Sequence, residues 1–302
     1  MPHTIGYVTG TTDDPAHYKF LDVLKNFAVA NGWEQLMYDG TSDNRYVFLK
    51  GPGLTGEDPV WVGLDTYQSV ASGYYNVAVG VATNYLESQT YYNQPQMKRI
   101  GVPLFYDRID YWITLNAQRI VFVCKVGQNY YEHGYMGKFI PYCSPLQYPY
   151  PVFVGGMFGY YYNESYIRQS QSYLYTSYHE VPYIGNQYTS SNSSSYGYNG
   201  QVYSSFDGKW ESVNKYTLGY LGISLNDEKP IYNIDLTMRY NSNPSYQRLT
   251  AGLYGTLDGV YRVQSDYEEV YPEDTITVGE NTYIAFPSRN STEATYLLRM
   301  DT

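Results

Sequence analysis

The residues that could do chemistry are few, and they do not fall into the spacings of known catalytic motifs. The 302-residue chain has no G-x-x-x-x-G-K-[ST] phosphate loop, no G-x-G-x-x-G opening a helix, no H-E-x-x-H and no G-x-S-x-G. The nearest glycine cluster, GGMFGYYY at 155–162, has neither a nucleophile nor a following helical pattern. The sequence therefore argues against nucleotide-binding and serine-hydrolase chemistry.

Two carboxylates, Asp107 and Asp110, flank Arg108 just before the tract YWITL. Glycoside hydrolysis requires a pair of Asp or Glu residues. A D-R-I-D tract that enters a hairpin more often supplies a turn and a local ion pair, and a chain with 29 acidic residues contains such pairs by chance. We predict no catalytic residue, and a glycan depolymerase that uses these two carboxylates is the enzymatic alternative.

Metal ligands are similarly sparse. The four histidines are scattered, and only His179 and Glu180 place two ligand types together, on opposite faces of an extended segment. The tract GEDPV holds Glu57 and Asp58 without the alternating acidic pattern of a calcium loop. The remaining acidic group is predicted to be a solvated turn and comprises Asp266, Glu268, Glu269, Glu273 and Asp274. We predict neither a metal site nor a cofactor.

The cysteines and the N-terminus bear on the compartment. Cys124 and Cys143 are too few for a disulfide framework or a metal cage, and both are interpreted as small apolar residues. No basic segment followed by an apolar run opens the chain, and no stretch of about 18 apolar residues occurs in it. We expect synthesis without export and no membrane insertion.

Composition gives the strongest signal. Aromatic residues make up 18% of the chain, with 41 Tyr, while charged residues make up only 16%, against roughly 25% in ordinary soluble domains. The formal charge of −10 repels a phosphate backbone, so nucleic-acid binding is not expected. Abundant rings with few charges are typical of surfaces that other proteins cover, because a charge must be desolvated on binding.

The hydrophobic pattern predicts a mainly β protein with antiparallel sandwich-like or barrel-like domains and one N-terminal helix. Asp14 is the expected helix N-cap, Pro15 fits the first helical position, and Gly32 ends the pattern. The helix should bury one face formed by Phe20, Leu24, Phe27 and Ala28. Strand-like tracts follow at 45–50, 59–64, 74–82, 110–116 and 118–126.

Three of the later patterns add detail to this prediction. The tract 110–126 predicts a hairpin turning at Asn116 and Ala117, whose second arm is apolar on both faces and therefore central. Strict alternation over 231–240 predicts a half-buried strand. The tracts DGVYRV, DTITVG and NTYIAFP predict an antiparallel meander.

A change in composition divides the chain into three parts. We predict an N-terminal β-rich domain with one helix at 1–157, a Tyr/Ser/Asn-rich insertion or arm at 158–204, and a C-terminal β domain at 205–302. Tyrosines of the insertion have almost no aliphatic neighbours in sequence, so they need packing partners from elsewhere. These interface candidates are Tyr160, Tyr161, Tyr162, Tyr166, Tyr173, Tyr175, Tyr178, Tyr183, Tyr188, Tyr196 and Tyr198.

Several tracts carry a resemblance to a known family. FLKGPG (48–53), VWVGLDTY (60–67), YWITLNAQRIVFVCKV (111–126), YMGKFIPY (135–142) and QYPYPVFVGG (147–156) resemble virion structural proteins of contractile-tailed bacteriophages. The helix ending at Gly32-Trp33 and the C-terminal tracts LDGVYRV and DTITVGENTYIAFP resemble them as well. The similarity spans nearly the whole chain apart from the Tyr-rich insertion.

The resemblance implies a non-enzymatic tail component, at the baseplate, that packs in multiple copies against tube, sheath or baseplate proteins. Placement at the collar, the neck or the capsid surface is left open. A carbohydrate-binding host-recognition module of a fibre or spike is the alternative, because rings stack on sugars and Asn or Gln side chains supply hydrogen bonds. A glycan array would separate the two.

Overall fold

A computed structural model describes most of the chain. Its described residues are 1–127, 130–142, 150–156, 200–204, 208–215, 231–238, 253–263, 270–287 and 296–301. Strands account for 58% of the structure and helices for 10%, and all strand pairs are antiparallel. The predicted mainly β, sandwich-like architecture is confirmed, and the sheets of the described residues do not close into a barrel.

The smaller sheet has five strands in sequence order. They are β2 (Glu34–Asp39), β3 (Tyr46–Gly51), β4 (Val60–Ser69), β5 (Tyr74–Ala82) and β6 (Lys98–Leu104). Strand β5 is buried along its whole length, as expected of a run that is apolar on both faces. Two short 3₁₀ turns, Val70–Ser72 and Tyr91–Asn93, lie in the connections.

The larger sheet has thirteen strands. Its order begins with β1 (His3–Thr9), β7 (Arg108–Asn116), β8 (Arg119–Val126), β9 (Tyr130–Lys138), β11 (Val152–Gly155), β12 (Gly200–Ser204) and β13 (Lys209–Lys215). It continues with β14 (Ile231–Met238), β15 (Leu253–Val263), β18 (Tyr296–Arg299), β17 (Asn281–Phe286) and β16 (Thr275–Val278). The short β10 (Ile140–Pro141) pairs with β15.

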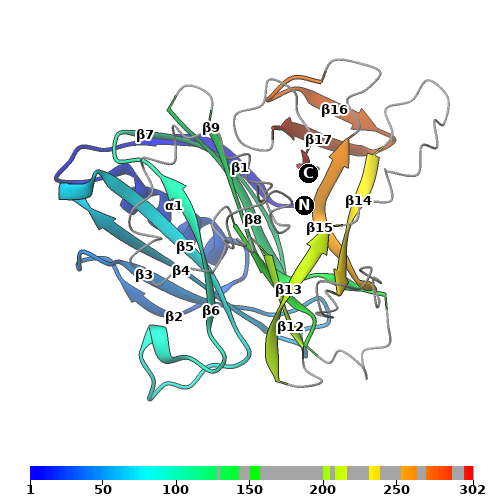
Figure 1. The fold of residues 1–302 in the computed structure, drawn as a ribbon, viewed down its shortest axis with the longest axis horizontal. Coiled ribbons are helices and arrows are strands. Elements are labelled where there is room, and N and C mark those ends of the chain that lie inside the picture. Colours follow the sequence, from blue (N-terminus) through cyan, green and yellow to red (C-terminus); the bar gives the residue numbers. More distant parts are fainter. Residues whose placement is uncertain are drawn as a thin grey trace, which may run out of the picture.

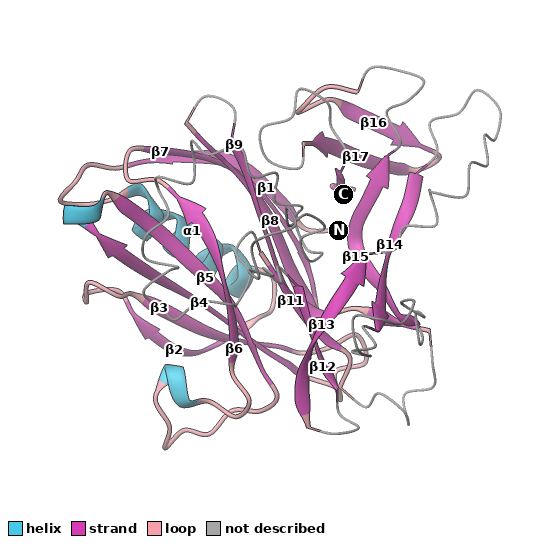
Figure 2. Cartoon of the chain, viewed as in Figure 1, coloured by secondary structure: helices cyan, strands magenta, loops and turns pink. Residues whose placement is uncertain are grey.

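Three layers result, with β7, β8 and β9 in the middle (Figures 1 and 2). One face of these strands packs on the small sheet and the helix in a core that includes Val62, Val79, Ile113 and Phe122. The other face packs on β14, β15, β17 and β18 in a second core that includes Trp112, Val123, Leu236, Phe286 and Leu298. The large sheet therefore folds back on itself, and its second core contains residues from both sides of residue 157.

Helix α1 (Ala16–Ala30) confirms the N-terminal prediction with its start shifted by one residue. Pro15, rather than Asp14, occupies the N-cap position, and no side chain caps the helix there. Leu21 and Leu24 are fully buried, and the ring of Phe20 lies 5.1 Å from that of Phe122. Gly32 ends the helix with φ 89°, a left-handed conformation that glycine adopts without strain.

The predicted central hairpin is present, and its turn lies one residue later than expected. Asn116 pairs with Arg119, so Ala117 and Gln118 form the turn. Strand β8 lies between β7 and β9 and is buried except at Lys125. Asn116, which was predicted in the turn, is the last residue of β7. From there its side-chain oxygen accepts hydrogen bonds from the N–H groups of Gln118 and Arg119, as Asn does beside turns.

The C-terminal tracts form strands as predicted, with one difference in their order. Ile234 and Leu236 of β14 are buried while Asn233 is exposed, which confirms the alternation. Strands β16, β17 and β18 form an antiparallel meander. Strand β15, which contains DGVYRV, pairs with β18 instead of β16.

Candidate functional site

The tyrosines predicted as interface candidates lie outside the described residues. All eleven, Tyr160, Tyr161, Tyr162, Tyr166, Tyr173, Tyr175, Tyr178, Tyr183, Tyr188, Tyr196 and Tyr198, fall between 157 and 199. His179, Glu180 and Cys143 also lie outside the described ranges. The site is therefore built from the polar clusters and exposed surfaces of the described residues.

The carboxylates considered for catalysis occupy a strand end. Asp110 forms an ion pair with Arg108, whose Nη2 atom lies 2.7 Å from Asp110 Oδ1. The Arg108 guanidinium also lies over the ring of Tyr7, 4.5 Å from its centroid. The hydrogen bond to Asp110 raises the pKa of Arg108. These contacts are those of a local ion pair, and Asp107 contributes its backbone oxygen to the N–H of Gly10.

Two further acidic candidates, Asp58 and Glu273, also have protein partners, whereas Asp266, Glu268 and Glu269 lie outside the described residues. Asp58 accepts from the Lys138 ammonium at 2.9 Å and from the Thr55 hydroxyl at 3.0 Å. Glu273 is exposed, as predicted, and its Oε1 atom accepts from both Lys125 and Tyr131 at 2.6 Å. In the described ranges, no three His, Cys, Asp or Glu side chains come together as a metal site would require.

Burial keeps two histidines and one cysteine neutral. Burial lowers the pKa of His133 to about 4, and burial together with Arg45 lowers that of His17 to about 3. The ring of His133 hydrogen-bonds the backbone oxygen of Pro287 at 2.9 Å. Cys124 is buried and free, and burial raises the pKa of its thiol well above the ordinary value. A thiol of this kind is inert.

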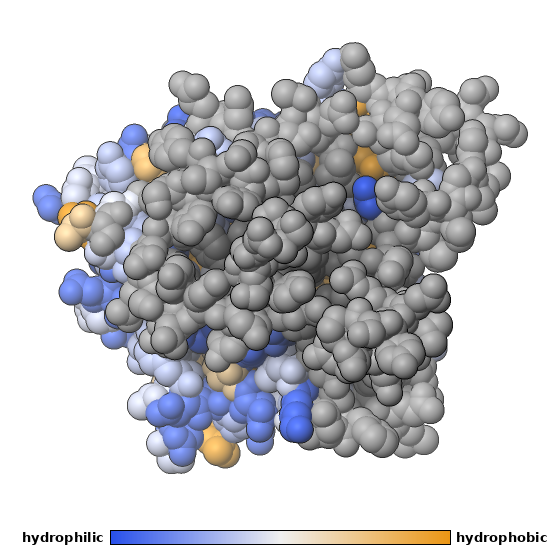
Figure 3. All heavy atoms as spheres, in the orientation of Figure 1, coloured by the Kyte–Doolittle hydropathy of each residue, from blue (hydrophilic) through white to orange (hydrophobic). Residues whose placement is uncertain are grey.

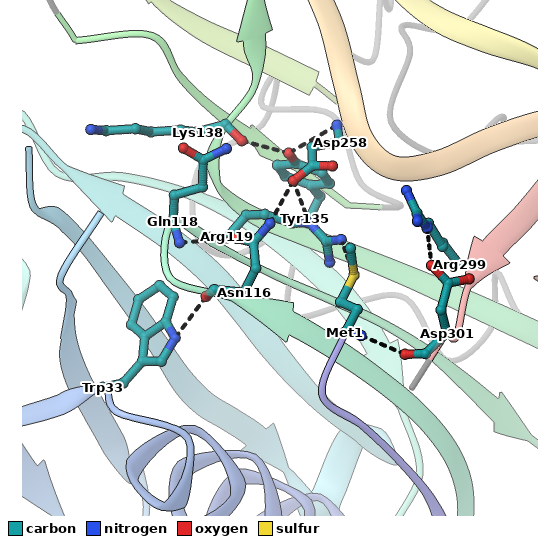
Figure 4. Close-up of polar contacts among 10 residues, drawn as sticks. All are labelled: Met1, Trp33, Asn116, Gln118, Arg119, Tyr135, Lys138, Asp258, Arg299 and Asp301. Atoms are coloured by element: carbon teal, nitrogen blue, oxygen red, sulfur yellow. Dashed lines mark hydrogen bonds and ion pairs between the residues drawn. The ribbon is translucent and has the colours of Figure 1, made fainter. Parts of the chain in front are cut away.

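The chemically richest cluster is a buried polar junction centred on Arg119 (Figure 4). Arg119 is fully buried, and its Nε atom donates to Asp258 Oδ2 at 3.2 Å. Asn116 Nδ2 donates to the same oxygen at 2.6 Å. The Asn116 backbone oxygen accepts from the indole N–H of Trp33 at 3.0 Å. The junction thus connects the central hairpin to β15 and to Trp33, three residues after the end of α1.

Both chain ends meet at this junction. The Met1 sulfur lies 2.6 Å from Arg119 Nη2, and the Met1 amino group donates to the backbone oxygen of Asp301 at 2.6 Å. Asp301 also accepts a hydrogen bond from the side chain of Arg299. Sequence reasoning missed the whole cluster, since nothing in the local pattern of Arg119 indicates a partner in β15. Its chemistry is that of a structural clamp, because its charges face each other.

A second buried ion pair fixes the loop that covers the outer face of the small sheet. Asp65 is fully buried, accepts from Arg99 Nε at 2.8 Å and accepts from the Tyr91 hydroxyl at 2.9 Å. Burial alone would lower the pKa of Arg99, but the neighbouring Asp65 carboxylate outweighs it and raises this pKa. Gln94 holds the same loop by donating to the backbone oxygens of Leu86 and Gln89 at 3.1 Å.

The exposed apolar side chains give a different kind of candidate. Those visible in Figure 3 form small spots on a mostly hydrophilic described surface. Ile5 and Tyr7, which are 53% and 60% exposed, share one face of β1. Trp112, the cross-strand partner of Ile5, is already buried beneath Phe286, with ring centroids 5.0 Å apart. Among the described residues, the second core therefore ends at β7 and does not cover Ile5 and Tyr7 on this face of β1.

Strand β1 also has an open edge. It lies at one end of the large sheet and pairs only with β7 among the described strands (Figure 1). The N–H of Leu115 in β7 donates to the backbone oxygen of Pro2, and the N–H of Gly10 donates to the backbone oxygen of Asp107. The even-numbered residues of β1 therefore direct their backbone groups at β7. By the alternation of an antiparallel ladder, the backbone groups that face away from β7 belong to His3, Ile5, Tyr7 and Thr9.

Comparison with known proteins adds no assignment. No protein-family model matches the chain, and no curated protein matches it. Among the described residues, no helix is both long and apolar enough to cross a bilayer. The open edge of β1, with Ile5 and Tyr7 beside it, is the candidate functional site of the described residues.

Proposed function

We propose that this chain is a structural subunit of a bacteriophage contractile tail, located at the baseplate. It acts through protein–protein contacts, in multiple copies, with tube, sheath or baseplate proteins. The chain is made in the host cytoplasm and resides in the virion. This role needs no catalytic residue and no cofactor.

The open edge of β1 is the observation that carries the proposal. A row of unpaired backbone N–H and C=O groups is a template for pairing with another chain, and proteins that stay monomeric protect such edges. Ile5 and Tyr7 add exposed apolar area next to it. Assembly subunits use surfaces of this kind because strand pairing joins chains without any reactive group.

The resembling tracts lie mainly in the strands of the two sheets. Tract 48–53 overlaps β3, tract 60–67 covers most of β4, and tract 111–126 covers most of β7 and all of β8. These strands form the two sheets that face each other across the first core. The resemblance to tail proteins therefore covers the scaffold of the sandwich and does not depend on a single surface loop.

Detection in the particle tests the proposal most directly. The chain should be found by mass spectrometry in purified tails, and density fitting its sandwich should be found at the baseplate of a reconstructed virion. Absence of the chain from purified particles would refute the proposal. If the chain is found only at the collar, the neck or the capsid, the proposed location is wrong and the proposed structural role remains.

A deletion tests whether the Tyr-rich tract contributes to assembly. Gly155 of β11 and Gly200 of β12 are cross-strand partners, so removal of residues 160–198 leaves residues 156–159 and 199 to close a hairpin. Hairpin loops of about 2–5 residues are common, and the shortened chain should fold. We expect it to melt near the wild-type temperature and to be missing from particles. If the shortened chain is incorporated into particles normally, the Tyr-rich tract is not part of the assembly interface.

A further inference from the structure

Among the described strands, β1, β16, β2 and β6 stand at the ends of the two strand orders and are edge strands, and three of these four are protected. Strand β2 begins at Glu34, ends at Asp39 and carries a bulge after Gln35. Strand β6 contains Lys98, Arg99 and Pro103, and a proline cannot donate to a new strand. The four-residue β16 follows Asp274 and is too short to template a long pairing. Charges, prolines, bulges and short length are the usual protections of an edge.

Strand β1 has none of these protections along its length. Its seven residues, HTIGYVT, include no Lys, Arg, Asp, Glu or Pro. Among the described residues, the hydrogen bond at its edge lies at the far end, where the Lys19 ammonium donates to the backbone oxygen of Thr9 at 2.9 Å. The backbone groups of Ile5 and Tyr7 that face away from β7 have no partner among the described residues.

The sequence of β1 is nearly self-complementary about Gly6. In an antiparallel pair of β1 strands centred on Gly6, Ile5 lies opposite Tyr7 of the partner subunit, and His3 lies opposite Thr9 of the partner subunit. His3, Ile5, Tyr7 and Thr9 all direct their backbone groups at the open edge. The Ile5–Tyr7 and His3–Thr9 pairs across the axis are therefore hydrogen-bonded pairs of the new ladder. Pairs of an aromatic and a β-branched residue stabilise antiparallel strands.

We propose that β1 pairs antiparallel with β1 of a second copy of this chain, across a two-fold axis at Gly6. The two large sheets then become one continuous sheet, and each Ile5 packs on Tyr7 of the partner subunit. This inference rests on the proposed assembly role and names one of its partners. A single strand edge buries less than the area of about 1,200 Å² found in stable complexes, so the pair is a concentration-dependent dimer.

Sedimentation velocity of the purified full-length chain tests the pairing without any virus particle. Wild-type protein should shift from monomer to dimer as its concentration rises at physiological salt. Ile5→Pro removes an N–H that faces the open edge and leaves the bonds to β7 in place, so it should abolish the dimer and retain the wild-type melting temperature. The matched control is Ile5→Thr, which keeps the N–H and should retain dimerisation with weaker affinity.

Paired charges test the register. Ile5→Lys alone should leave the chain monomeric, as should Tyr7→Glu alone. The double variant places opposite charges across the proposed axis and should restore a dimer that dissociates as salt is raised. In a register with Ile5 opposite itself, the same double variant would bring like charges together and stay monomeric.

Two results would overturn the inference. One is a wild-type chain that remains monomeric at every soluble concentration, including the case in which only a different tail protein binds the edge. The other is an Ile5→Pro chain that dimerises as the wild type does. Either result leaves the proposed function standing if the chain is found in purified tails, because that measurement does not depend on self-association.

Discussion

Arg119 and Asp258 lie 139 positions apart in the sequence, yet Arg119 Nε is 3.2 Å from Asp258 Oδ2 inside the protein. Arg119 begins β8 and is fully buried, while Asp258 belongs to β15 and is 14% exposed at its side chain. The pair connects the central hairpin to the sheet that covers its second face. Because the ion pair joins β8 to β15, a change that loosens one of the two cores is expected to destabilise the other.

Replacing Asp258 by Asn should destabilise the protein strongly. The change leaves the buried Arg119 guanidinium without a counter-charge, and breaking a buried ion pair costs about 3–5 kcal/mol. The free energy of unfolding from urea titration measures the loss. Asp110→Asn is the matched control, since the Arg108–Asp110 pair is exposed and exposed pairs contribute little to stability. Equal losses in the two variants would contradict a buried clamp.

Gly259→Ala should be more harmful than an ordinary glycine substitution. Gly259 has φ 75°, and a Cβ atom there would lie 2.0 Å from Arg119 Nη2. Gly279→Ala provides the control, because its φ is 59° and nothing lies within 4 Å of the added carbon. We expect about 1–2 kcal/mol of strain in both variants and about 1–3 kcal/mol more at Gly259. Thermal unfolding would show the difference.

Stability should fall as the pH is lowered from 6.5 towards 4. The pKa of His133 is lowered to about 4 and that of His17 to about 3, so in this window the unfolded chain binds a proton at each site that the native state does not. The contribution of each histidine is present above its unfolded pKa near 6.5 and is lost as the pH falls. Each adds a slope of at most about 1.4 kcal/mol per pH unit.

The single variants His133→Gln and His17→Gln assign this slope. Each should make the pH dependence of the unfolding free energy shallower by one proton, and the double variant should remove both. Urea titrations at pH 6.5, 5.5 and 4.5 supply the comparison. A double variant with an unchanged slope would place the titration on other groups.

Tyr91→Phe should loosen the loop over the small sheet. It removes the hydrogen bond from the Tyr91 hydroxyl to the buried Asp65 carboxylate, and bonds to charged groups contribute about 1.5–3 kcal/mol. Hydrogen exchange of the amides in the 83–97 loop should accelerate in this variant. Tyr7→Phe, which alters an exposed ring, should leave the exchange of that loop unchanged. Similar exchange in both variants would mean that Arg99 alone fixes Asp65.

The local sequence pattern was sufficient to predict an element where the cause of its structure lies within a few neighbouring residues. The 3.6-residue spacing of Phe20 and Leu24 predicted α1, because an amphipathic helix repeats its buried face within each turn. The apolar run of β8 predicted a central strand, since a strand covered on both faces has no polar side. The strands β1, β2, β6, β9, β10, β11, β12, β13 and β18 were not predicted, and β12 lies within the stretch 158–204 that was predicted as an insertion or arm. The exposed Ile5 and Tyr7 of β1 break the usual rule that the apolar side is buried.

The amino-acid sequence by itself determined the mainly β class, the single long helix of the described residues, the hairpin and the scarcity of charge. Only the tertiary structure decided which strands became edges, where the second core ends, and that Arg119 meets Asp258. The reason is that antiparallel pairing joins residues that are distant in sequence, so a strand's neighbours depend on the path of the whole chain. The open edge of β1 exists because that path places no described strand beside it.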